Sequence, residues 1–187
     1  MTRHVPSASG GPRSWLRQWK RLTAVGALLA WVLLLRGFVV EPRSIVSNSM
    51  KPTLLAGDQV VMDKLSYRFH PPRAGDIVVF VLPDEAQRPG GPPPPATLKR
   101  VIALPGQRVE VREGQVLVDG HALSEPYLQE LPRYTWGPAQ VPEGMLFVLG
   151  DNRNASSDSH DWGFLPRRNV LGRAWVRYWP LRRAGGL

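Results

Sequence analysis

The 187-residue sequence contains no cysteine. This absence excludes a disulfide, a zinc–thiolate site and a thiol nucleophile, and it leaves the redox compartment open. The sequence also lacks any clustering of histidines, since its four lie far apart and show no metal-ligand spacing: His4, His70, His121 and His160. We therefore expect no metal site.

Acidic residues are scarce relative to basic ones. The chain has 24 Lys and Arg against 15 Asp and Glu, which gives a net charge of +9. Such a balance suits an anionic partner, either nucleic acid or a negatively charged membrane surface. The basic residues are scattered and match no nucleic-acid recognition module, so we expect no nucleic-acid partner. With 43% hydrophobic residues, the chain can build one moderate domain plus an appendage.

Long hydrophobic runs are absent except near the N-terminus. A polar, basic segment at residues 1–21 precedes the apolar run Leu22–Leu35, and apolar residues resume after Arg36. As a helix, residues 22–40 would cover roughly 28 Å at ~1.5 Å per residue, close to the thickness of a bilayer core. Arg36 near the far end could extend its side chain to the interface. Residues 22–40 therefore predict a transmembrane anchor.

Two other interpretations of this segment are a cleaved signal peptide and a buried helix of a soluble protein. A signal peptide needs small residues just after its apolar core, and Arg36-Gly37-Phe38-Val39 does not supply them. We expect an uncleaved anchor with interfacial Trp15 and Trp19. The basic residues before it predict a cytoplasmic N-terminus, with everything after Val40 on the outer face.

Beyond the anchor, no helical period extends over more than a few turns, and the patterns are those of β-strands. Residues 108–118 alternate on either side of Glu113-Gly114, which predicts a hairpin with one buried face. Short apolar runs predict further strands at residues 60–62, 77–82, 145–149 and 170–178. We predict a mainly β fold, an antiparallel sheet or barrel-like domain over residues 41–180.

Two segments are expected to lie outside this sheet. Residues 83–96 carry a proline run that cannot join a sheet ladder, which predicts an exposed loop, either a spacer or a partner site. Residues 181–187 are expected to form a frayed tail.

Ser49 lies in the segment Ser47-Asn48-Ser49-Met50-Lys51-Pro52-Thr53-Leu54. Pro52 fixes its own φ and biases Lys51 away from helix, so the backbone should be extended or turning here. A hydroxyl on a rigid turn suits a nucleophile, and it suits an ordinary serine turn equally well.

A lysine occurs in an apolar, strand-like context at Lys99. Alternation puts Lys99 and Val101 on one face of the strand. A buried lysine loses hydration and its pKa falls, so its neutral amine can act as a general base. A surface lysine beside Arg100 is the simpler interpretation of this stretch alone.

A third stretch, residues 150–163, is dense in turn formers and short polar side chains, as in a solvated loop or a network that orients catalytic groups.

Taken together in their order, these motifs resemble the type I signal peptidases of bacteria and organelles. The matching motifs are Ser49-Met50-x-Pro52-Thr53-Leu54, Gly75-Asp76-Ile77-Val78, Lys99-Arg100-Val101-Ile102 and Gly150-Asp151-Asn152-Arg153-x-x-Ser156-x-Asp158-Ser159. They follow the anchor, and the resemblance reaches from there to about Trp179.

The resemblance implies a serine endopeptidase with a Ser/Lys dyad. Ser49 would be the nucleophile and Lys99 the general base, while the Ser49 N–H and the Ser47 hydroxyl would hold the oxyanion and Ser156 would orient the Lys99 ammonium. It also implies that Asp151 and Asp158 brace the polar loop, with Arg153 and Arg100 as their charge partners. No metal or organic cofactor is implied.

The resemblance also implies a substrate and a place of action. An extended preprotein signal peptide would pair with a strand edge, and small apolar pockets would select residues such as alanine at the first and third positions before the cut. The residues expected to line these pockets are Ile45, Met50, Leu54 and Leu98. The enzyme would act as a monomer in the lipid bilayer of a plasma membrane or a thylakoid.

One departure from the family pattern is His160, where the family usually has arginine. A Ser49/His160/Asp158 triad is imaginable, but the dyad positions are intact, so we interpret His160 as a structural substitute.

Three alternative functions share parts of the pattern: a conjugal-transfer or pilin-maturation peptidase, a self-cleaving cytosolic repressor, and a catalytically idle membrane-tethered β binding domain. The anchor argues against the repressor, and intact Ser49 and Lys99 argue against the idle domain.

Overall fold

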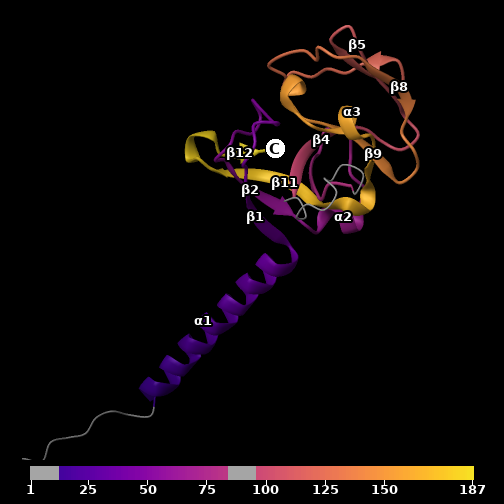
Figure 1. The fold of residues 1–187 in the computed structure, drawn as a ribbon. Helices are drawn as coiled ribbons and strands as arrows, with labels where there is room; N and C mark the ends of the chain where they lie inside the picture. The colour runs from indigo at the N-terminus through magenta and orange to yellow at the C-terminus, as the bar shows by residue number, and fades with distance from the viewer. Residues whose placement is uncertain (1–12, 84–95) are drawn as a thin grey trace, which may run out of the picture. The chain divides into compact units, whose positions relative to one another are not determined.

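The computed structural model describes residues 13–83 and 96–187. The chain separates into two compact units, Met1–Phe38 and Val39–Leu187 (Figure 1). Most of the Pro-rich segment 83–96, and the first part of the basic segment 1–21, lie outside the described residues.

The first unit contains a single described helix, α1 (Arg13–Phe38). It includes nearly all of the predicted anchor, and its large apolar side chains are exposed, among them Leu22, Leu28 and Leu33. Across the described residues, no helix combines the length and the apolar character needed to span a membrane.

The second unit is mainly β, as the alternation predicts, with only short helices α2 (Ser66–Phe69) and α3 (Ser159–Trp162). The strands are β1 (Val40–Ser44), β2 (Gln59–Asp63), β3 (Ile77–Phe80), β4 (Thr97–Ala103), β5 (Arg108–Arg112), β6 (Gln115–Val118), β7 (His121–Ala122), β8 (Trp136–Gln140), β9 (Met145–Leu149), β10 (Leu165–Pro166), β11 (Val170–Trp179) and β12 (Gly185–Gly186).

These strands form two sheets. One has the order β1-β2-β11-β3-β4-β9-β10, with β12 paired to β11, and the other has the order β7-β6-β5-β8. Every pairing in both is antiparallel. The predicted hairpin is confirmed as β5–β6, whose turn residues Glu113 and Gly114 have φ of 52° and 75°. Positive φ at both positions is what a two-residue hairpin turn requires.

Each predicted apolar run contains a strand, and β3 and β9 are the most deeply buried of these strands. The β3 side chains are all buried, and so are four of the five in β9. Strand β4 lies between β3 and β9 in the larger sheet, and its residues 99–103, which alternate between the two faces, are all buried. This central place is why polar side chains on β4 are held away from solvent.

The tail at residues 181–187 is not frayed, contrary to our expectation. Strand β12 pairs with β11, and the Leu187 N–H donates to the Trp175 carbonyl at 3.0 Å. Arg183 also forms an ion pair with Asp58 at 2.9 Å. Backbone pairing and a buried counter-charge therefore fix a segment whose glycine-rich composition indicated mobility.

Candidate active site

Ser49 lies in the loop between β1 and β2, which we call the serine loop (residues 45–58). Its neck is closed because the Ile45 N–H donates to the Asp58 carbonyl at 2.9 Å and the Gly57 N–H donates to the Ile45 carbonyl at 2.8 Å. The side chains of Ile45, Met50 and Leu54 are buried in one core cluster. The loop is thus fixed to the core on both sides of Ser49.

The polar loop (residues 150–163), which follows β9, holds the serine loop from the other side. The Asn152 N–H donates to the Ser49 carbonyl at 3.0 Å, and the Asn152 side chain donates to the Asn48 carbonyl at 3.1 Å. A Cβ on Gly150 would lie 2.4 Å from the Ser49 carbonyl oxygen and 2.2 Å from Ser156 Oγ. The two loops therefore approach so closely that only glycine fits at position 150.

Lys99 lies on β4 opposite Val78 of β3 and is only 3% exposed. Burial lowers its pKa to about 8, although the nearby carboxylates of Asp158 and Asp151 act in the opposite direction. Its ammonium has no hydrogen-bond partner within residues 13–83 and 96–187. Lys99 is therefore a buried residue and not the surface lysine that its stretch alone favours.

Ser49 and Lys99 line one hollow of about 380 Å³. Ser47, Leu82 and Trp162 also contribute to its wall. The Ser47 and Ser49 hydroxyl oxygens are 3.1 Å apart, so one hydroxyl donates to the other. A pair of hydroxyls and a buried amine thus face the same hollow.

A smaller hollow of about 40 Å³ adjoins the first, since both are lined by Ser47, Ser49 and Thr97. Three of the four predicted pocket residues line it: Ile45, Met50 and Leu98. Leu54 does not, and is fully buried instead. Its N–H donates to the Met50 carbonyl at 2.9 Å, and this turn directs the Leu54 side chain into the core.

Ser156 is 8% exposed, and its buried Oγ has no hydrogen-bond partner among the residues described. No hydrogen bond joins it to Lys99 in this part of the chain, so its role in orienting the ammonium stays a prediction. An unpartnered buried hydroxyl is costly, which is a reason to look for a functional use.

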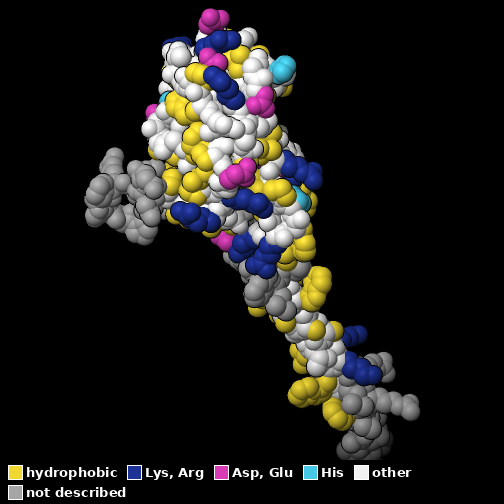
Figure 2. All heavy atoms as spheres, turned by 90° about the vertical axis from the view of Figure 1, so that its right-hand side faces the viewer, with side chains coloured by type: hydrophobic (Ala, Val, Ile, Leu, Met, Phe, Trp, Pro, Cys, Tyr) yellow, Lys and Arg dark blue, Asp and Glu magenta, His cyan; other side chains and the backbone are white. Residues whose placement is uncertain are grey.

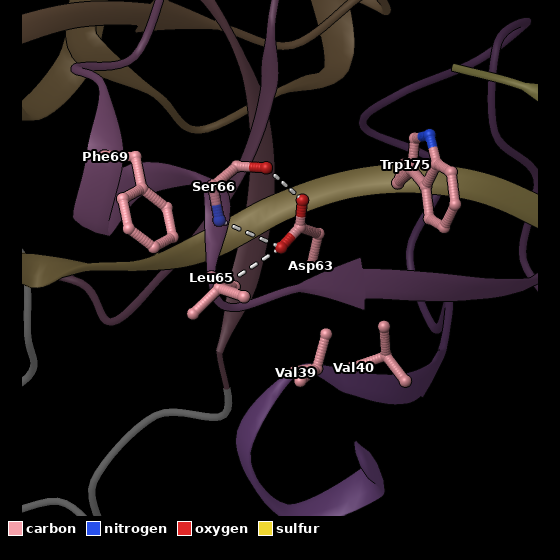
Figure 3. A pocket seen from close by; sticks show the side chains of 7 residues that line it. All are labelled: Val39, Val40, Asp63, Leu65, Ser66, Phe69 and Trp175. Carbon is pink, nitrogen blue, oxygen red and sulfur yellow. Dashed lines mark hydrogen bonds between the residues drawn. The ribbon is translucent and has the colours of Figure 1, made fainter.

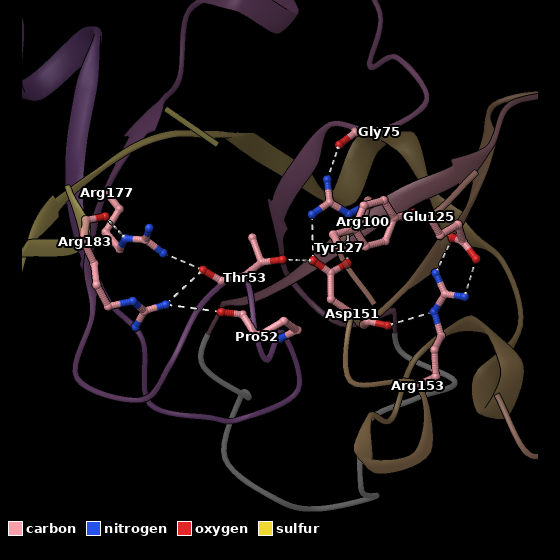
Figure 4. A network of polar contacts seen from close by, with 11 residues as sticks. Pro52, Thr53, Gly75, Arg100, Glu125, Tyr127, Asp151, Arg153, Arg177 and Arg183 are labelled. Atoms are coloured by element: carbon pink, nitrogen blue, oxygen red, sulfur yellow. Dashed lines mark hydrogen bonds and ion pairs between the residues drawn. The ribbon is translucent and has the colours of Figure 1, made fainter. Parts of the chain in front are cut away.

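A network of charged side chains braces the two loops (Figure 4). Arg100 donates to both oxygens of Asp151, at 2.8 and 2.6 Å, and to the Gly75 carbonyl at 2.9 Å. Arg153, which is 1% exposed, pairs with Glu125 through two hydrogen bonds of 2.8 and 2.5 Å. Its Nε also donates to the Gly150 carbonyl at 3.1 Å. The predicted pairing of Arg100 with Asp151 is therefore present.

The family model for signal peptidase, peptidase S26, matches residues 16–179. The chain belongs to this family. It is 49% identical to a probable signal peptidase I-1 of Synechocystis sp., covering 94% of this chain and 90% of that protein. It is 46% identical to a signal peptidase I of Leptolyngbya laminosa, covering 96% of this chain and 89% of the relative.

A more distant relative is a probable thylakoidal processing peptidase 2 of Arabidopsis thaliana, 41% identical over 92% of this chain and 48% of the plant protein. A crystal structure of a signal peptidase I from Enterococcus faecalis is 33% identical, covering 55% of this chain and 95% of that one, with a TM-score of 0.42. The membership confirms the resemblance seen in the motifs. This signal peptidase is a hydrolase, a serine endopeptidase.

His160, the residue that departs from the expected family motif, is the partner of Asp158. The fully buried Asp158 carboxylate accepts from the Gly150 N–H at 2.8 Å and lies 2.7 Å from His160 Nδ1. This hydrogen bond is the main cause that raises the pKa of His160, while its partial burial acts against it. The ring also stacks on Tyr134, with 4.1 Å between centroids.

Our pairing of Asp158 with an arginine was wrong, because Arg153 turns instead to Glu125. Sequence reasoning missed Glu125, and it missed Tyr127, whose ring lies 4.0 Å beneath the Arg100 guanidinium. Both belong to an irregular segment with no motif. The one available signal was indirect: a buried arginine requires a carboxylate.

Proposed function

We propose that this signal peptidase cuts preproteins with a dyad of Ser49 and Lys99. The observation that carries the proposal is Lys99 itself, buried without an ion-pair partner in the described chain and lining the same hollow as the Ser49 hydroxyl. A lysine whose pKa is about 8 is neutral in a useful fraction of molecules near neutral pH, and can therefore accept a proton.

In the proposed mechanism the Ser49 Oγ attacks the scissile carbonyl while its proton passes to the neutral Lys99 Nζ. The tetrahedral oxyanion is held by the Ser49 N–H and by the Ser47 hydroxyl, which lies 3.1 Å from Ser49 Oγ. The resulting Lys99 ammonium then protonates the leaving amine as the C–N bond breaks. Lys99 next takes a proton from water, which hydrolyses the Ser49 ester and restores the serine.

The size of the small hollow supports cleavage after small residues. Its volume of about 40 Å³ is little more than the roughly 30 Å³ occupied by one water molecule. It is also much smaller than the neighbouring hollow of about 380 Å³, so the small hollow is the more confined of the two. We infer that Ile45, Met50 and Leu98 select alanine-like residues next to the cut and that the signal peptide pairs with a strand edge in extended form.

We further propose that residues 22–40 anchor the enzyme in a bilayer. Exposed apolar side chains along α1 support this assignment (Figure 2). In the second unit, Phe69 and Trp175 line an apolar hollow of about 280 Å³ with Val39 and Val40, the last two residues of the proposed anchor segment (Figure 3). Exposed aromatic side chains of this kind suit a membrane–water interface.

The basic N-terminal segment would remain cytoplasmic, and the peptidase unit, acting as a monomer, would lie on the outer face. The proposed location is a plasma membrane or a thylakoid membrane. Two relatives support it, the probable signal peptidase I-1 of Synechocystis and the probable thylakoidal processing peptidase 2 of Arabidopsis.

Cleavage of a preprotein with an Ala-x-Ala site by the detergent-solubilised full chain tests this proposal. The wild type should cut after the second alanine, and Ser49→Ala and Lys99→Ala should each lose at least about 1000-fold in kcat/KM. Ser124→Ala, at an exposed serine outside the site, is the matched control and should retain full activity. Failure on several preproteins by folded wild type would favour a dedicated maturation peptidase or a binding domain instead.

A further inference from the structure

The C-terminal segment of the peptidase unit contacts the serine loop directly. From this segment the Arg183 guanidinium donates to Asp58 at 2.9 Å. Its second terminal nitrogen donates to the carbonyls of Pro52 and Thr53 at 3.2 and 3.3 Å (Figure 4). Pro52 and Thr53 lie three and four residues after Ser49. A single side chain near the end of the chain is thus bonded to the backbone that follows Ser49.

Arg177 of β11 reinforces this contact. Its Nη1 donates to the Thr53 carbonyl at 2.5 Å, and its Nε donates to the Arg183 carbonyl at 2.5 Å. Two guanidinium groups therefore converge on one carbonyl. Asp58, which is 2% exposed, compensates their charge through ion pairs of 2.9 Å with Arg183 and 3.7 Å with Arg177.

The side chain of Thr53 faces the opposite way. Its hydroxyl donates to Asp151 at 2.5 Å. Asp151 also forms an ion pair with Arg100, which follows Lys99 on β4. Thr53 thus connects the C-terminal arginines to the strand that carries Lys99. Planar, multiply bonded guanidinium contacts define geometry more tightly than a single hydrogen bond does.

We propose that Arg183, together with Arg177, is a positioning residue that fixes Ser49 relative to Lys99. The serine loop is held at its neck by Ile45 and before Pro52 by Asn152, and the arginines supply the hold on the remaining side. This inference rests on Ser49 being the nucleophile. Its physical basis is that proton transfer requires the two groups in hydrogen-bond reach, so a displacement of about 1 Å can cost about 100-fold in rate.

The test compares Arg183→Ala with Arg182→Ala in the full chain, because Arg182 is an exposed neighbour of the same charge. In Arg183→Ala, kcat should fall about 10- to 100-fold while KM changes less than about twofold. Arg182→Ala should match the wild type. The acid limb of the pH–rate profile should stay in place in Arg183→Ala, since the surroundings of Lys99 are intact.

Arg183→Lys keeps the test decisive should the alanine variant not fold. A lysine can reach Asp58 or one carbonyl but cannot bridge all three, so kcat should fall about tenfold with the fold and KM preserved. Wild-type kcat per folded molecule in both variants, or a loss that appears in KM alone, would overturn the proposal. Ser49→Ala is measured alongside: if it still cleaves, the nucleophile assignment fails, whereas an inactive Ser49→Ala with a fully active Arg183→Lys refutes the positioning role only.

Discussion

The role proposed for Lys99 as a neutral base opposes the stability of the fold. In the unfolded chain its pKa is near 10.5 and in the folded protein about 8, so at pH 7 folding buries a charge at a cost of about 3 kcal/mol. We predict that Lys99→Met raises the free energy of unfolding at pH 7 by up to about this amount and abolishes cleavage.

The pH dependence of this gain follows from the sign of the shift. Because the unfolded chain binds the extra proton between pH 8 and 10.5, wild-type stability rises through that window, and the advantage of Lys99→Met shrinks there. Thermal unfolding at pH 7 and pH 10 measures both effects. A Met variant less stable than wild type at pH 7 contradicts the account.

His160 contributes stability in the opposite pH window. Its pKa is raised above 6.5 by Asp158, so the stabilisation is fully present below pH 6.5 and is lost as pH rises through the folded-state pKa. The melting temperature of wild type should exceed that of His160→Gln more at pH 6 than at pH 8. His160→Arg, which stays charged, should retain its advantage at pH 8 and remain active. An inactive His160→Arg would show that the imidazole itself is required.

At the scale of single residues, the sequence predicted those that belong to motifs and missed those that do not. Ser49 and Lys99 could be found because their patterns, each ambiguous alone, occur together in the order of the signal peptidase motifs. Glu125 and Arg183 could not, because each meets its partner, Arg153 or Asp58, only after distant segments fold together.

At the scale of elements, the close approach of the serine loop and the polar loop is the feature that arranges the site. We predict that Gly150→Ala lowers stability by about 1–3 kcal/mol, as overpacking does, and kcat by about 100-fold, because the new Cβ must displace Ser156 or the Ser49 backbone. Melting temperature and steady-state kinetics provide the measurement. Gly26→Ala, where nothing lies within 4 Å of the added carbon, is the control, and wild-type kcat in Gly150→Ala would refute the claim.

The strands were predictable individually, but their order was not. Residues 170–178 were expected to form a strand, yet nothing local indicates that β11 lies between β2 and β3, both of which come far earlier in the chain. The frayed-tail prediction failed for the same reason, since β12 is held by pairing with β11 rather than by its own composition. Non-local contacts decide both outcomes.

At the scale of the whole molecule, the chain divides into two units, Met1–Phe38 and Val39–Leu187, and the first unit contains most of the proposed anchor. We predict that the full chain stays with membranes during alkaline carbonate extraction, whereas residues 39–187 alone are released. Exposed Phe69 and Trp175 should give the shorter chain only weak, extractable binding. Release of the full chain by carbonate would show that residues 22–40 do not anchor it.

The dyad is the central claim, and the pH dependence of single-turnover cleavage tests it most directly. If neutral Lys99 is the base, the rate should rise with pH and reach half its maximum near pH 8, and Lys99→Met should show no such rise. The contradicting result is a rate that rises with pH near the pKa of histidine, with the rise still present in Lys99→Met and absent in His160→Gln. That result would make His160 the base.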